Sequence, residues 1–290
     1  MGRTLSCILL IAAVTVASVV ICPVEIQAEP YPPELYVGGF LIGPQAYTFN
    51  RFTFFEAVDK AKEAGASVIE AYPGQRLSPD DERPFNHDAS PEVWAKAKMK
   101  LKKTGVRLVN YGVVGLGSTE ESMRKVFNFV TIMEIPCITT EPANEEDFDL
   151  IEKLVREYDI KVAIHNHPKP SKYWDPNYVL EVIKDRDPRI GACADTGHWM
   201  RSGVKPLEAL EILKGRIISS HLKDLNEFDV RDAHDVHYGE GKANLKAILD
   251  EYRKQGFTGN ISIEYEYNWE NNVDDVAACI DFVREYGKTN

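Results

Sequence analysis

The chain has 290 residues, 44% of them hydrophobic, and a net charge of −11, a composition typical of a folded globular protein. The acidic charge and the lack of a Lys/Arg cluster exclude a general nucleic-acid-binding role, because phosphate backbones attract basic surfaces. The length suits one α/β barrel, so we expect a single domain over residues 29–290.

Residues 1–28 differ in character from the rest of the chain. Arg3 precedes an apolar run from Ile8 to Val20, and Ala28 ends the segment before Glu29. This pattern is typical of a secretory signal peptide, and the apolar run is short for a membrane-spanning helix. We therefore expect an exported protein, periplasmic or secreted, with no stable membrane insertion after cleavage.

Short apolar runs bounded by turn residues predict buried strands of a parallel sheet, and amphipathic segments between them predict helices. The expected strands are 35–42, 67–71, 106–114, 136–140, 160–164, 190–194, 216–220 and 260–265. The expected helices are 53–64, 91–103, 118–133, 144–158, 177–184, 206–213, 243–255 and 273–286. Capping boxes at Thr53/Glu56 and Ser118/Glu121 mark two of the helix starts. Residues 74–90 and 224–241 are expected to be polar loops.

The strict alternation of strands and helices predicts right-handed crossovers and a parallel sheet. Eight such units in this length favour a closed (β/α)8 TIM barrel over an open sheet, and no G-x-G-x-x-G motif follows the first strand. Beyond residue 28 the cysteines are Cys137, Cys193 and Cys279, an odd number without a C-x-x-C pair. We expect them to be buried free thiols.

Polar residues follow most of the predicted strands at their C-terminal ends, where the active site of a parallel barrel lies. They are Glu70, Glu141, His165, His167, Asp195, His198, His221, Lys223 and Glu264. The spacings along the chain correspond to whole strand–helix units, so side chains at equal depth converge on one axis. Two Glu, an Asp and a His suit one divalent ion, Mn²⁺, Mg²⁺, Co²⁺ or Zn²⁺, with positions open to a substrate.

A metal in such a site acts as a Lewis acid on a sugar carbonyl and hydroxyl. A flanking carboxylate then removes the proton on the carbon beside that carbonyl. This is the chemistry of sugar isomerisation through an enediolate, with a small-molecule carbohydrate as the partner.

Six segments in this order resemble the sugar phosphate isomerase/epimerase superfamily, whose members are xylose isomerase-like TIM barrels. They are AYTF at 46–49, IEAYPGQ at 69–75, IHNHP at 164–168, ADTGHW at 194–199, SHLKD at 220–224 and IEYE at 263–266. The resemblance covers nearly all of residues 29–290. It implies that Glu141, Asp195, His221 and Glu264 bind the metal and that Glu141 and Glu264 are the acid/base pair. His167, His198 and Lys223 would then hold substrate oxygens.

Other polar residues are less clearly assigned. Of His165 and His167 we expect one to face the axis, and we favour His167. Glu70 either contacts substrate or pairs with a basic residue, and His87 and His234 are expected on loop surfaces. Asp235 and His237 are expected on a loop that folds over the site and brings His237 to the substrate, with Gly239 and Gly241 as turn points.

We favour an isomerase or epimerase of a free sugar or keto-sugar, because export separates the protein from most phosphorylated sugars. Three alternatives stay open. A lyase acting on 3-keto-glycosides would use the same residues, and a metal phosphodiesterase resembling endonuclease IV would recruit His198, Asp235 and His237. A non-catalytic carbohydrate-binding barrel is the third. The oligomeric state is not determined by the sequence, and a homo-oligomer is compatible with it.

Overall fold

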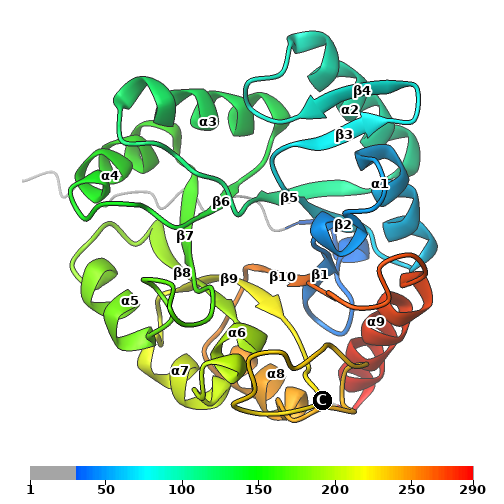
Figure 1. Cartoon of the computed structure of the whole chain (residues 1–290), viewed down its shortest axis with the longest axis vertical. Coiled ribbons are helices and arrows are strands. Elements are labelled where there is room, and N and C mark those ends of the chain that lie inside the picture. The colour runs from blue at the N-terminus through cyan, green and yellow to red at the C-terminus, as the bar shows by residue number, and fades with distance from the viewer. Residues whose placement is uncertain (1–30, 290) are drawn as a thin grey trace, which may run out of the picture. The chain divides into compact units, whose positions relative to one another are not determined.

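A computed structural model describes residues 31–289, so the expected signal segment 1–28 lies outside the described residues. From Pro32 onward the chain forms one compact unit, built on an eight-stranded parallel sheet in the order β1-β10-β9-β8-β7-β6-β5-β2 (Figure 1). The strands are β1 Leu41–Pro44, β2 Val68–Ala71, β5 Arg107–Tyr111, β6 Cys137–Thr140, β7 Lys161–His165, β8 Ile190–Asp195, β9 Ile217–Leu222 and β10 Asn260–Ile263. The expected barrel is confirmed.

Helices surround the strands and cover the outer face of the barrel (Figure 1). The α-helices of residues 31–289 are α1 Phe54–Glu63, α2 Pro91–Thr104, α3 Glu120–Met133, α4 Asp147–Tyr158, α5 Pro176–Ile183, α6 Thr196–Arg201, α7 Pro206–Ile212, α8 Leu245–Lys254 and α9 Val273–Lys288. Each long helix buries an apolar stripe against the strands, as Val126, Phe127 and Val130 of α3 do. None of the helices described has the length and hydropathy that a membrane crossing requires.

The barrel closes where its first two strands meet. One parallel bridge, from Gln45 to Glu70, links the end of β1 to β2. The side-chain Nε2 of Gln45 also donates a hydrogen bond of 2.7 Å to the carbonyl of Gly112, just after β5. The strands approach so closely that a Cβ on Gly43 would lie 2.0 Å from the carbonyl oxygen of Val68. Closure therefore depends on a residue without a side chain at this position.

The first strand begins later than expected from the apolar run 35–42. Pro33 starts a short 3-10 helix, Pro33–Leu35, and Gly38 and Gly39 then adopt positive φ angles. The chain turns back at these glycines, and Val37 and Phe40 exchange backbone hydrogen bonds of 2.8 and 2.9 Å. The apolar residues before Phe40 thus do not join the eight-stranded sheet.

The polar segment 74–90 was expected to be a loop but contains an antiparallel hairpin of β3 (Gln75–Ser78) and β4 (Asp81–Phe85). The hairpin is held by apolar residues within a polar sequence. Leu77 and Phe85 are fully buried, and the ring of Phe85 stacks on Phe54 of α1 at 4.3 Å. The hydrophobic periodicity of the sequence did not predict this hairpin, because most of its other residues are exposed.

Helix starts were predicted with mixed success. The capping box of Thr53 and Glu56 is present, whereas α3 is capped by Thr119 with Ser122, one residue later than expected. Helix α6 was not anticipated, and the Asp195 carboxylate caps it by accepting from the backbone N–H of His198 at 2.7 Å. The three cysteines of the barrel are free and buried, as expected.

We expect Gly43→Ala to destabilise the protein by about 3 kcal/mol, since the new methyl group has no space beside Val68 and overpacking of this kind costs roughly 1–3 kcal/mol. Gly115→Ala is the matched control, because an added Cβ there meets no atom within 4 Å. Urea denaturation of both variants measures the difference. Equal stability of the two would contradict the role of Gly43 in closing the barrel.

Candidate active site

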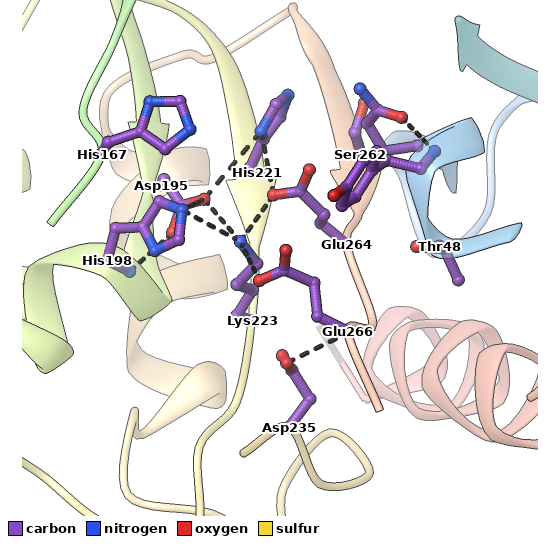
Figure 2. Close-up of polar contacts among 12 residues, drawn as sticks. Thr48, His167, Asp195, His198, His221, Lys223, Asp235, Ser262, Glu264 and Glu266 are labelled. Carbon is purple, nitrogen blue, oxygen red and sulfur yellow. Dashed lines mark hydrogen bonds and ion pairs between the residues drawn. The ribbon is translucent and has the colours of Figure 1, made fainter. Parts of the chain in front are cut away.

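Four buried side chains converge at the C-terminal ends of neighbouring strands. His165 ends β7, Asp195 ends β8, His221 lies near the end of β9, and Glu264 follows β10. One donor atom of each lies within 4.8 Å of the others, and Figure 2 shows Asp195, His221 and Glu264 pointing toward one another. The strands are in register at this level, with Asp195 paired to His221, so the sheet itself brings these groups together.

The two imidazoles of this cluster present unpartnered nitrogens to its carboxylates. His165 Nε2 lies 3.5 Å from Asp195 Oδ2, and His221 Nδ1 lies 3.3 Å from Glu264 Oε2 and 3.9 Å from Asp195 Oδ2. Both nitrogens are buried and lack a hydrogen-bond partner among the described residues. Buried imidazole nitrogens without a hydrogen-bond partner, together with carboxylates, are ligands of the kind that bind a divalent cation.

Of the two roles open to Glu70, substrate contact or pairing with a basic residue, the structure shows pairing: Glu70 lies behind His221 and does not line the substrate cavity. Its carboxylate is completely buried, and both oxygens lie 3.1 Å from His221 Nε2. Ser262 Oγ donates to the same carboxylate at 2.5 Å. This contact fixes the ring of His221 and leaves its Nδ1 directed at Asp195 and Glu264, as a carboxylate behind a metal-binding histidine does.

Glu141, expected as a metal ligand and as one of the acid/base groups, lies at the edge of the cluster. It follows β6, and its Oε1 lies 2.9 Å from His165 Nδ1 and 2.6 Å from His167 Nδ1. The backbone N–H of His167 also donates to Oε1 at 3.0 Å. The expectation that one of these histidines faces the axis fails, because residues two apart on an extended chain point to the same face. His165 stands between Glu141 and Asp195, and His167 also contacts Glu141.

Lys223 is buried among the carboxylates of the site (Figure 2). Its Nζ donates to Asp195 Oδ2 at 2.9 Å and to Glu264 Oε2 at 2.5 Å, and lies 3.2 Å from Glu266 Oε2. A Cβ on Gly197 would lie 2.7 Å from the Lys223 side chain, so the glycine of the ADTGHW segment makes room for it. The ammonium was expected to hold substrate oxygens, but it contacts these carboxylates.

Burial and charge oppose each other in this cluster. Burial raises the pKa of Glu264, but Lys223 and His221 outweigh it and hold that pKa well below its usual range. Burial lowers the pKa of His165, yet Asp195 and Glu141 raise it to about 9. Burial also lowers the pKa of His221, but Cys193, Glu70 and Glu264 outweigh it and raise that pKa well above its usual value. Against the effect of burial, the neighbouring histidines and Lys223 also hold the pKa of Asp195 below its usual range, so Asp195 and Glu264 are ionised at neutral pH.

Arg201 of α6 completes the network and was not anticipated from the sequence. Its Nη1 lies 3.2 Å from both His198 Nδ1 and Glu266 Oε2, and its Nη2 lies 3.5 Å from Asp235 Oδ2. The sequence did contain a signal for Arg201. His198 and Arg201 follow Asp195 at intervals of three residues, so in a helix they lie on the same face.

The loop after β9 is held over the site as expected, but His237 does not reach it. Asp224 accepts backbone hydrogen bonds from Gly239, Gly241 and Ala243 at 2.9–3.0 Å, which folds the loop back. His237 Nε2 lies 2.7 Å from Asp275 Oδ1 on α9. His237 therefore does not join His198 and Asp235, and the guanidinium of Arg201 occupies the space between those two.

A cavity of about 730 Å³ opens above the cluster. His167, His198 and Glu264 line its floor, and residues 231–234 of the loop, including His234, form one wall. The other wall is aromatic: Tyr47 lies edge-on to Tyr72 at 5.3 Å and to Trp269 at 6.0 Å. Sequence patterns did not indicate this wall, because its residues come from three separate loops.

The family model for the xylose isomerase-like TIM barrel matches residues 144–286, the part of the chain that contains His165, Asp195, His221 and Glu264. Among curated proteins, the uncharacterized protein MJ1311 of Methanocaldococcus jannaschii is 31% identical over 47% of this chain and 45% of its own. The inosose isomerase of Halalkalibacterium halodurans is 26% identical over 48% of this chain and 54% of its own. The chain thus spans about half the length of the curated relatives it matches.

Solved structures extend the similarity over most of the chain. An uncharacterized protein from Parabacteroides distasonis is 34% identical, with a TM-score of 0.69 over 84% of this chain and 98% of that one. A xylose isomerase-like TIM barrel protein from Mycobacterium smegmatis, solved in complex with magnesium, shares the fold at 13% identity, with a TM-score of 0.70 over 88% and 99% of the two chains. The chain belongs to the xylose isomerase-like TIM barrel family.

Proposed function

We propose that the protein is a metal-dependent isomerase or epimerase that acts on a free sugar or keto-sugar. The observation that carries this proposal is the buried cluster of His165, Asp195, His221 and Glu264, with two imidazole nitrogens left unpaired below an open cavity. The similarity to an inosose isomerase supports the reaction class. Export of the protein, expected from residues 1–28, remains a prediction.

Asp195, His221 and Glu264 would hold the ion, and His165 would supply the fourth ligand. The donor set of two carboxylates and two imidazoles suits Mn²⁺, Mg²⁺, Co²⁺ or Zn²⁺. The magnesium complex of a protein with the same fold supports this proposal. The bound ion supplies Lewis acidity toward a sugar carbonyl and hydroxyl.

The proton transfer would be carried out by groups on two sides of the cavity floor. Glu264 lines the cavity as an ionised carboxylate, so it can accept a proton from the carbon beside the carbonyl. On the other side, Glu141 binds His167 through Nδ1, which leaves the Nε2 of His167 to exchange a proton with the sugar. We assign Glu264 and the Glu141–His167 pair to the two acid/base positions.

The cavity lining favours a carbohydrate as the substrate. Tyr47, Tyr72 and Trp269 offer apolar ring surfaces with polar tips, while His198 and Glu266 offer hydrogen-bonding groups to hydroxyls. Of the alternatives, a 3-keto-glycoside lyase would use the same residues and remains a second candidate. A phosphodiesterase with several metal ions is disfavoured, because Arg201 lies between His198 and Asp235. The intact cluster disfavours a purely binding barrel.

We expect about one divalent ion per chain in wild type, measured by elemental analysis after reloading and desalting. Asp195→Asn and His221→Ala should each lose it, since each change removes a donor atom from the buried set. His237→Ala is the matched control and should keep the ion, because His237 contacts Asp275. Two or more ions in wild type, or retention in both variants, would contradict the proposed centre.

The same measurement separates two assignments of the fourth ligand. If His165 binds the ion, as the distances favour, His165→Ala should lose it while Glu141→Gln keeps most of it. Loss in Glu141→Gln with retention in His165→Ala would instead support the ligand set that the sequence resemblance implies.

We expect Glu264→Gln and Glu141→Gln each to lower the rate of proton exchange by roughly 10²–10⁴-fold, the usual contribution of a general acid or base. The readout is deuterium incorporation from heavy water at the carbon beside the carbonyl of a panel of keto-sugars. Glu227→Gln, a loop carboxylate outside the cavity lining, is the control for substituting a surface glutamate. Wild-type exchange rates in both site variants, with unchanged circular dichroism, would disprove the mechanism.

Metal affinity should rise as the pH increases from about 7 to 9. His165 has a pKa of about 9 in the metal-free protein and the pKa of His221 is also raised above its usual value, so both rings carry a proton that a metal must displace. Calorimetric titration in buffers of different ionisation enthalpy should therefore detect proton release. His165→Ala should release fewer protons, and pH-independent binding would show that these rings are not ligands.

A further inference from the structure

A second cavity of about 620 Å³ borders the proposed sugar pocket. It is lined by Arg51, by Asp275 of α9 and by residues of the segment that joins β10 to α9 (Figure 1). Trp269 lines both cavities, so the two share a wall at this residue. None of the groups that make up the metal cluster lines the second cavity.

The segment after β10 directs its side chains to the two cavities in alternation. Glu264 and Glu266 line the first cavity, whereas Tyr265 and Tyr267 line the second. Alternation of this kind is the consequence of an extended backbone. The same segment thus carries a proposed metal ligand on one face and an aromatic surface on the other, and Trp269 at its end reaches both sides.

The rim between the cavities is also aromatic. The ring of Tyr267 is 49% exposed and stacks on His234, with centroids 4.5 Å apart and planes inclined by 27°. His234 lines the first cavity and Tyr267 lines the second, so this stack, like Trp269, presents ring surface to both cavities. Exposed ring faces with polar edges suit the alternating apolar faces and hydroxyls of a sugar.

Polar groups of the second cavity are available to bind hydroxyls. The carboxylate of Asp275 is oriented by His237 at 2.7 Å and by Asn268 at 2.9 Å. Arg51 and Glu270 have no hydrogen bond or ion pair with any residue from 31 to 289. A small number of oriented polar groups beside aromatic rings is the usual composition of a small-molecule site.

We propose that the second cavity is a subsite for a second sugar ring, so that the substrate is a reducing disaccharide or a keto-glycoside whose glycosidic bond crosses Trp269. This inference rests on the proposed function, since the first ring must occupy the cavity above the metal cluster. It extends the substrate beyond a lone monosaccharide and explains the role of Tyr267, which the metal chemistry does not require.

The test is isothermal titration calorimetry of the metal-loaded full chain with glucose, galactose and mannose, and with cellobiose, lactose and mannobiose. At least one disaccharide should bind about tenfold more tightly than its component monosaccharides, the gain expected from one stacked ring. Tyr267→Ala should remove that gain and leave monosaccharide affinity unchanged. Phe228→Ala removes an aromatic ring that is 39% exposed and lies outside both cavities, so it should have no effect.

Two outcomes would overturn the subsite. Either no disaccharide binds more tightly than its monosaccharides, or Tyr267→Ala weakens both kinds of sugar equally, which would assign Tyr267 to the shape of the first cavity. Binding of neither kind of sugar would contradict the proposed carbohydrate function itself, and the subsite with it. Thermal melting of each variant verifies that the fold is retained.

Discussion

The centre of this protein depends on keeping two buried carboxylates, Asp195 and Glu264, ionised. An unpaired buried charge costs several kcal/mol, so the chain surrounds both groups with cationic and donor partners. Lys223 contacts one oxygen of each, and the backbone of α6 donates to the other oxygen of Asp195. Lys223 thus stabilises the same oxygens, Asp195 Oδ2 and Glu264 Oε2, that face the unpaired nitrogens of His165 and His221.

A second set of charged residues orients the histidines and Glu266 around these two carboxylates. Glu70 orients His221, Glu141 orients His165 and His167, and Arg201 links His198 to Glu266. Glu141 and Arg201 act through neighbours that line the cavity, whereas Glu70 acts through His221 of the buried cluster. These contacts leave His165 and His221 in the buried cluster and His167 and His198 at the cavity. In the proposed reaction, histidines therefore serve both for metal binding and for proton exchange.

The barrel supplies the rigid frame, and two loops complete the site above it. The loop 224–241 is tied down by Asp224, and its residues 231–234 form a wall of the larger cavity. The segment 264–272 forms the opposite side and separates the two cavities through Glu266, Tyr267 and Trp269. Differences in these loops can therefore change the substrate without disturbing the metal cluster, as in other barrels of this architecture.

Sequence patterns alone determined the barrel, the order of its strands and the residues at their C-terminal ends, because apolar runs and strand–helix alternation are local properties. Asp195, His221 and Glu264 were found this way, since equal depth on parallel strands forces them together. The positions of Glu70, Glu141 and His165 were decided by the tertiary structure, because alternation gives the face of a strand but not which of two neighbouring polar groups reaches the axis. Arg201, the aromatic wall and the second cavity depend on how separate loops fold over the barrel, and no local pattern encodes that arrangement.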